Sequence, residues 1–352
     1  MDYINALKVF APSAIAFFIG IGLTPFLTDF LYKHKMWKKK VGKQDLNGND
    51  TPIFNKLHEK KDTGTPRMGG IIIWASTGIT VLLFWLASVI WAENPLLQKL
   101  NFLSRNQTWL PLFTLIFASL IGLADDIMQV VGNGDKKSGL AFRWRLLVVT
   151  LLGLIGGLWF YTRLDFMLDI PFWHPISLGL WIIPLFIVVI VSLFSSGVID
   201  GLDGLSGGIM AIIFAAYGAI ALFQDQIDLA AFCMVVSGST LAFLWFNIPP
   251  ARFYMTETGI LGLTTALAVV AFLTHSVLVL PIIAFPLLAT AVSVIIQLAS
   301  KKFRHGKKVF LVAPLHHHFE AIGWPATKVV MRYWVITVVT AIIGIVVALI
   351  GK

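Results

Sequence analysis

Ten long stretches of apolar residues alternate with shorter polar segments along the chain. About 20 mostly apolar residues in helical form cross the hydrocarbon core of a bilayer. The pattern therefore predicts an all-α, polytopic membrane protein with about ten transmembrane helices, forming one integral-membrane domain over residues 1–352. Pro281 and Pro286 should kink or break the ninth helix. The ten stretches are 9–31, 69–92, 108–124, 146–162, 177–194, 205–223, 229–246, 258–275, 277–300 and 333–350.

Charge is scarce in this chain and unevenly distributed. Only 13% of residues are charged, against about 25% in soluble domains. Alternate polar segments (32–68, 125–145, 195–204, 247–257 and 301–332) hold 22 of the 27 Lys and Arg residues. Cytoplasmic loops of membrane proteins carry such an excess, so these segments are predicted to be cytoplasmic and both termini extracytoplasmic. For the cluster Lys33–Lys43, topology and contact with anionic lipid are favoured over a direct role with substrate, and no nucleic-acid partner is expected.

Two pairs of aspartates lie in the predicted cytoplasmic segments. Asp125 and Asp126 are adjacent, directly after the third stretch, and their mutual repulsion favours a divalent cation or a basic partner. Asp200 and Asp203 are three residues apart among glycines, which lets a ligand approach the backbone closely. Carboxylates of this kind suit Mg²⁺ completed by phosphate oxygens. A solvated helix end and a glycine-rich packing segment are the respective structural alternatives.

Two further polar clusters follow. Arg252 and Glu257 come after two prolines that stop a helix, so a short rigid loop should present both side chains. The segment His316-His317-His318 lies inside the last basic loop, where contact with phosphate, stacking on a nucleotide or proton transfer is expected. A zinc site is disfavoured there, because adjacent residues rarely bind one metal together and no spaced His or Cys completes the ligand set.

The order and spacing of these clusters resemble the polyprenyl-phosphate N-acetylhexosamine-1-phosphate transferase superfamily. The resembling segments are 64–70, 125–126, 200–204, 246–259 and 313–320. Asp-Gly-Leu-Asp-Gly (200–204) is shared across the superfamily, whereas Ala-Pro-Leu-His-His-His-Phe-Glu (313–320) is similar to its muramoyl-pentapeptide branch. The resemblance implies ten transmembrane helices with an active-site cleft on the cytoplasmic side.

The resemblance also implies an activity in the bacterial cytoplasmic membrane. A Mg²⁺-dependent enzyme would transfer phospho-N-acetylmuramoyl-pentapeptide from UDP-N-acetylmuramoyl-pentapeptide to undecaprenyl phosphate, giving lipid I and UMP for peptidoglycan synthesis. Asp125, Asp126 and Glu257 would be the catalytic residues and the Mg²⁺ ligands, and a homodimer is compatible with this reading. The residues implied to contact substrate are Lys61, Arg67, Arg145 (with Arg143 as its alternative), Asp200, Asp203, His316, His317 and His318.

The chain departs from the family pattern close to these residues. The family's Lys and Thr before the second helix are Asp62 and Arg67, a Lys after the aspartate pair is Gln129, an Asn before Asp200 is Gly197, and Gly-Asp is Thr256-Glu257. Two alternatives therefore remain: a related transferase that uses UDP-N-acetylglucosamine, and a catalytically impaired lipid-binding paralogue. A transporter is disfavoured, because its charges should lie mid-span near broken helices.

Overall fold

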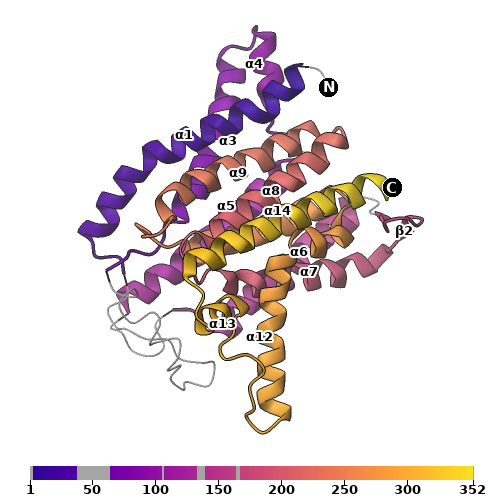
Figure 1. Ribbon diagram of the computed structural model, residues 1–352. Coiled ribbons are helices and arrows are strands. Elements are labelled where there is room, and N and C mark those ends of the chain that lie inside the picture. The colour runs from indigo at the N-terminus through magenta and orange to yellow at the C-terminus, as the bar shows by residue number, and fades with distance from the viewer. Residues whose placement is uncertain (1–2, 38–63, 105–106, 133–138, 164–166, 352) are drawn as a thin grey trace.

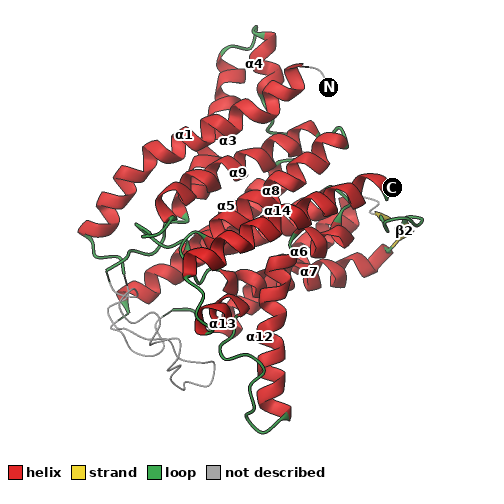
Figure 2. Cartoon of the chain, viewed as in Figure 1, coloured by secondary structure: helices red, strands yellow, loops and turns green. Residues whose placement is uncertain are grey.

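The computed structural model describes residues 3–37, 64–104, 107–132, 139–163 and 167–351, and this part of the chain is almost entirely helical (Figures 1 and 2). The long helices are α1 (Tyr3–Lys33), α3 (Ile71–Ile90), α5 (Trp109–Val131), α6 (Phe142–Arg163), α7 (Ile182–Ser196), α8 (Leu205–Phe223), α9 (Ile227–Asn247), α10 (Thr256–Leu273), α12 (Phe285–Phe303) and α14 (Ala326–Ile350). The short elements are α4 (Pro95–Leu100), α11 (Leu280–Ile283), α13 (Leu315–Ala321), the 3₁₀ turns η1 (Gly179–Trp181), η2 (Gly197–Ile199) and η3 (Val277–Val279), and an antiparallel strand pair, β1 (Met167–Leu168) and β2 (Ile176–Ser177).

The prediction of an all-α protein with ten membrane-crossing helices is confirmed. Within the described residues, ten helices are long and apolar enough to span a bilayer, and each overlaps one of the ten predicted stretches. The expected break in the ninth stretch is present: Pro281 lies at the start of α11 and Pro286 at the start of α12. Proline lacks the N–H that continues a helix, so it is tolerated in the first turn.

On the side that carries the polar motifs, three predicted boundaries were wrong. Helix α5 runs to Val131, so Asp125 and Asp126 lie within it rather than at its end. Helix α6 begins at Phe142 and includes Arg145, which was expected in a loop. Helix α14 begins at Ala326 rather than at residue 333. Hydropathy marks where apolar residues stop, whereas a helix continues for as long as its backbone hydrogen bonds are satisfied.

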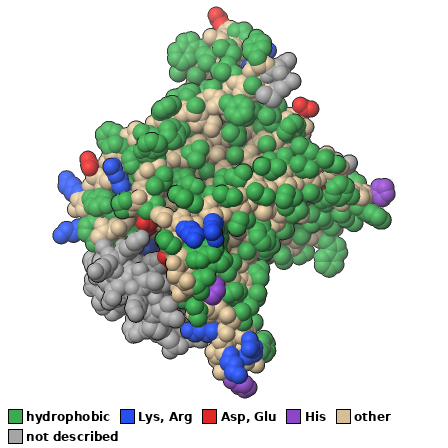
Figure 3. All heavy atoms as spheres, in the orientation of Figure 1, with side chains coloured by type: hydrophobic (Ala, Val, Ile, Leu, Met, Phe, Trp, Pro, Cys, Tyr) green, Lys and Arg blue, Asp and Glu red, His purple; other side chains and the backbone are tan. Residues whose placement is uncertain are grey.

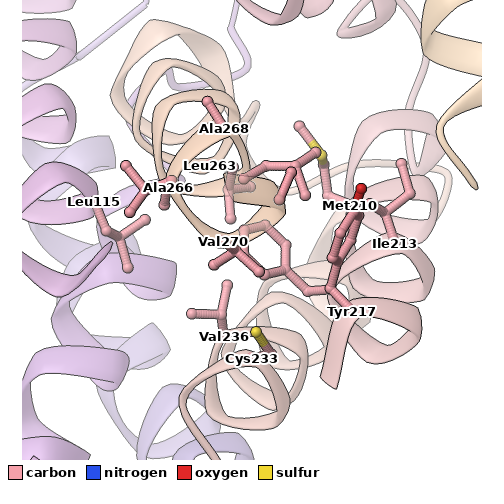
Figure 4. Packing of buried hydrophobic residues seen from close by; sticks show 14 of the residues in the cluster. Leu115, Met210, Ile213, Tyr217, Cys233, Val236, Leu263, Ala266, Ala268 and Val270 are labelled. Carbon is pink, nitrogen blue, oxygen red and sulfur yellow. The ribbon is translucent and has the colours of Figure 1, made fainter. Parts of the chain in front are cut away.

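Helices α8, α9 and α10 form the interior, and α10 is the most enclosed of the three. Figure 4 shows Tyr217 and Met210 from α8, Cys233 from α9 and Val270 from α10 directed toward one another, all fully buried. Helix α1 packs along α9, α5 along α10, and α6 along α7. Large apolar side chains remain exposed on the outer helices and cover most of the face in Figure 3, as a lipid-facing surface requires.

Close backbone contacts fix the N-terminal end of α10. A Cβ on Gly70, just before α3, would collide with the backbone of Gly259, and one on Gly122 in α5 would collide with the backbone carbonyl of Glu257. Glycine at these crossings lets the helices approach more closely than any other residue allows. The start of α10 is therefore held between α3 and α5, which positions the polar residues described next.

Candidate active site

Asp126 is the most heavily bonded carboxylate of the site. It is fully buried, and its Oδ1 accepts hydrogen bonds from Nε and Nη2 of Arg67 at 3.3 and 2.9 Å. Its Oδ2 accepts from the backbone N and the Oγ1 of Thr258 at 2.9 and 2.6 Å, and from Oγ1 of Thr256. A carboxylate offers about four lone-pair positions, so these contacts occupy it fully. Asp126 joins α5, α10 and the segment before α3.

Asp125 lies beside it but faces other partners. Its side chain is buried; Oδ1 accepts a hydrogen bond from the backbone N of Leu140, and Oδ2 accepts one from Nε2 of Gln129 at 2.9 Å. Nη1 of Arg145 lies 3.6 Å from the same Oδ2. Gln129 therefore occupies the position of the family's Lys with a neutral amide, which keeps a hydrogen bond to the aspartate and omits the positive charge.

Glu257 shares Arg145 with Asp125. Nη1 of Arg145 donates a hydrogen bond to Oε1 of Glu257, so one guanidinium nitrogen contacts both carboxylates. The side chains of Arg145 and Glu257 are each 23% exposed, whereas that of Asp125 is 1% exposed. Solvent thus reaches the Arg145–Glu257 pair more readily than it reaches Asp125.

Asp200 joins the same site through Thr256. Its Oδ2 accepts a hydrogen bond from the backbone N of Thr256 at 2.9 Å and its Oδ1 accepts one from Oγ of Ser206 at 2.7 Å. Burial raises the pKa of Asp200 above its usual value, although both hydrogen bonds oppose this shift. Asp203 contacts the neighbouring loop instead, where its Oδ2 accepts from the backbone N of Ala251 at 3.5 Å.

The histidine segment lies against the turn that carries these aspartates. A Cβ on Gly201 would meet Nε2 of both His316 and His317, and these two histidines are fully buried. Nδ1 of His317 pairs with Oε2 of Glu320 at 2.7 Å, which directs the opposite ring nitrogen toward the turn. His318 is half-buried, and its Nδ1 accepts a hydrogen bond from the backbone N of Leu311 at 3.3 Å.

The structure thus brings together most of the predicted site residues. Asp125, Asp126, Glu257, Arg67 and Arg145 form one connected cluster, which Asp200 adjoins, while Asp203 and His316–His318 belong to the adjacent turn and α13. Lys61 and Asp62 lie outside the described residues.

Two residues to which the sequence assigned no role hold these parts together. Asn247 accepts from the backbone N of Gly204 at 2.8 Å and donates to the carbonyl of Phe253 at 2.8 Å, and Thr258 binds Asp126. Asn247 is the last residue of α9, two residues before the first of the two prolines. That position is the only signal that the sequence offers for it.

Thr256 shows why the family pattern has glycine at its position. Its φ is +56°, a left-handed conformation that is uncommon for a β-branched residue and unstrained for glycine. Its hydroxyl donates to Asp126 and accepts from the backbone N of Met68 at 3.2 Å. These two bonds hold the strained residue in place.

The donor set fits a magnesium ion in part. Oxygen ligands suit Mg²⁺, which takes one or two carboxylates and completes its shell with water and substrate phosphate. Asp125 and Glu257 already hold one positive group between them, whereas the oxygens of Asp126 are engaged elsewhere. No cluster of three or more His, Cys, Asp or Glu residues surrounds a single position in the described chain, so the protein would supply two carboxylates.

A helical membrane domain with clustered carboxylates, guanidinium groups and a histidine-lined glycine turn is compatible with the class of membrane-embedded phosphosugar transferases. In agreement with this class, residues 108–275 match the model of glycosyl transferase family 4.

Relatives along the whole chain identify the family within that class. The chain is 32% identical to the phospho-N-acetylmuramoyl-pentapeptide-transferase of Chloroflexus aggregans, over 96% of this chain and 89% of the relative. The proteins of the same name from Anoxybacillus flavithermus and Levilactobacillus brevis are 34% and 36% identical, over 97% and 82% of this chain and 98% and 85% of theirs. The chain belongs to the phospho-N-acetylmuramoyl-pentapeptide-transferase family.

Proposed function

We propose that this protein transfers phospho-N-acetylmuramoyl-pentapeptide from UDP-N-acetylmuramoyl-pentapeptide to undecaprenyl phosphate, releasing UMP and forming lipid I. Family membership along the whole chain supports the substrates. The structural observation that carries the proposal is the meeting of α5, α6 and α10 at Asp125, Arg145 and Glu257, next to the turn that His316 and His317 contact.

The reaction requires an oxygen of the lipid phosphate to attack the donor's β-phosphorus while UMP leaves. Such transfers depend on positioning and on neutralising negative charge. We assign to Asp125 the role of assisting the attacking lipid phosphate, because every lone pair of the Asp126 carboxylate is already engaged in a hydrogen bond. Asp126 instead fixes Arg67 and the start of α10. His316, His317, Asp200 and Asp203 would hold the uridine and sugar of the donor.

Magnesium would be held by Asp125 and Glu257 and, when bound, would neutralise charge on the donor pyrophosphate. The chain's own contribution is to orient these carboxylates before the metal binds. Arg145 and Gln129 do so through the contacts described above. Arg145 is also the cation best placed to meet acidic groups of the donor.

The orientation in the membrane follows from the distribution of basic residues. In Figure 3 Lys and Arg side chains gather at the end of the molecule that carries α13, while α1 begins and α14 ends away from it (Figure 1). The positive-inside rule favours a cytoplasmic location for this end. We therefore propose a bacterial inner-membrane protein with a cytoplasmic active-site cleft and both termini extracytoplasmic. Association into a homodimer stays a prediction.

The test is a UMP-release assay on the full chain in nanodiscs with Mg²⁺ and undecaprenyl phosphate. UDP-N-acetylmuramoyl-pentapeptide and UDP-N-acetylglucosamine are supplied separately. We expect UMP from the first donor only, loss of activity on chelation, and a loss of at least about 100-fold in Asp125→Asn. Glu93→Gln, at an exposed position outside the site, should match the wild type. UMP from the second donor alone, or from neither with folded protein, would refute the assignment.

A further inference from the structure

The two arginines of the site are held in different ways. Arg67 uses Nε and Nη2 on the same oxygen of Asp126, and its side chain is 16% exposed against a fully buried partner. Arg145 contacts Glu257 and Asp125 through Nη1 alone, and its buried Nε has no hydrogen-bond partner among the described residues. An unsatisfied buried donor costs free energy. Arg145 is therefore the arginine that can leave its carboxylates at the lower cost.

The position of Nη1 overlaps the place of a metal. A magnesium ion bound to an oxygen lies about 2.0–2.1 Å from it, so a metal that binds both Oε1 of Glu257 and Oδ2 of Asp125 would occupy the space that Nη1 fills. Two cations in one pocket would also repel each other. The guanidinium would therefore have to move aside for a metal held by both oxygens.

We propose that Arg145 is a tethered competitor of the divalent cation: its guanidinium occupies the position between Asp125 and Glu257 and moves away when the metal binds. This inference rests on the magnesium site of the proposed function. The released guanidinium needs a new anionic partner, and the donor's phosphate or carboxylate groups supply one. Metal and donor binding are thereby coupled, each favouring the other to the same extent.

The alternative is that Arg145 helps to build the metal site and must stay in place. The two possibilities predict opposite effects of removing its charge on metal affinity in the absence of donor. If Arg145 competes with the metal, its removal tightens metal binding. If Arg145 orients the carboxylates without occupying the metal position, its removal weakens metal binding or leaves it unchanged.

The test measures Mn²⁺ binding to the full chain in nanodiscs by the electron paramagnetic resonance signal of free Mn²⁺, without donor or lipid substrate. Mn²⁺ accepts the same oxygen ligands as Mg²⁺. We expect Arg145→Gln to lower the Kd for Mn²⁺ about tenfold, equivalent to about 1.4 kcal/mol. Arg143→Gln is the matched control, because it removes the same charge two residues away from an exposed side chain; its Kd should stay within about twofold of wild type.

Further variants separate this inference from the proposed function. Glu257→Gln and Asp125→Asn should abolish Mn²⁺ binding; if both bind like wild type, the metal site itself is wrongly placed. If they lose binding but Arg145→Gln binds Mn²⁺ no more tightly than wild type, the competition is refuted and the metal site stands. Arg145→Lys serves if the glutamine variant does not fold. Its ammonium keeps the charge but lacks the fork of the guanidinium, so Arg145→Met, which removes the charge, is measured beside it, and a Kd that the methionine variant does not lower overturns the proposal equally.

Discussion

Thr256 offers the sharpest test of how the site is held together, because its backbone strain and its hydroxyl bonds act in opposite directions. The hydroxyl donates to buried Asp126 and accepts from the backbone N of Met68. A hydrogen bond to a charged group contributes about 1.5–3 kcal/mol, and an orphaned buried N–H costs about 1–3 kcal/mol. Against this, a left-handed conformation costs a non-glycine residue about 1–2 kcal/mol.

Three substitutions separate these contributions. Thr256→Val keeps the strain and loses both bonds, so we expect a loss of about 3 kcal/mol or more. Thr256→Gly loses the bonds and relieves the strain, for a net loss of about 2 kcal/mol. Thr256→Ser keeps the hydroxyl and should stay within about 0.5 kcal/mol of wild type. The expected order of stability is Ser equal to Thr, then Gly, then Val.

Thermal unfolding of the purified variants in one detergent measures this order. About 2 °C per kcal/mol for a chain of this size places the valine variant roughly 6 °C below wild type. Thr162→Val is the control, because Thr162 is exposed and its hydroxyl bonds only to its own helix. The reasoning fails if Thr256→Val unfolds at the temperature of Thr256→Ser, or if Thr256→Gly is more stable than wild type.

Three other outcomes are expected. Arg67→Thr should lower the free energy of unfolding by about 3 kcal/mol, because it leaves one oxygen of the buried Asp126 carboxylate without its cation. The double variant Arg67→Thr with Asp126→Asn should recover part of that loss. Losses that are strictly additive would contradict the pairing. Gly201→Ala should reduce donor turnover at least about tenfold, because the added Cβ would collide with His316 and His317. Gly22→Ala is the control: its Cβ meets nothing within 4 Å, so turnover should not change. Because the pKa of Asp200 is raised in the folded protein, the folded protein holds this proton more tightly than the unfolded chain does. The stability of the fold should therefore decrease as pH rises above about 4. Asp200→Asn should remove part of this pH dependence of the unfolding temperature.

The sequence predicted the number of membrane helices well and their polar ends poorly, for one physical reason. Lipid permits only long apolar helices, so hydropathy locates each span. Beyond the bilayer edge this constraint ends, and contacts within the protein decide where a helix stops. Asp125 and Arg145 both fell on the wrong side of a predicted boundary for this reason. Their helical location is what brings Arg145 between Asp125 and Glu257.

The partners within the site were beyond sequence reasoning for a related cause. Adjacent aspartates in a helix point in directions about 100° apart, as follows from 3.6 residues per turn. Asp126 consequently faces α10 and Arg67, while Asp125 faces Gln129 and Arg145. The sequence offered both as one pair with one role. Only the packing of α5 against α10 divides them into a carboxylate whose oxygens are fully engaged within the protein and one that we assign to the proposed reaction.

The departures from the family pattern bear on whether the protein is an impaired paralogue. Arg67 and Thr256 both bond to Asp126, and Gln129 bonds to Asp125. Substitutions that accumulate after a loss of function have no reason to form new hydrogen bonds to the same two carboxylates. Here a cation and a hydroxyl satisfy Asp126 together, and Thr256 tolerates its strained backbone because of that bond. The altered residues thus form one internally consistent site, which argues for a retained transferase activity reached by a different arrangement of charge.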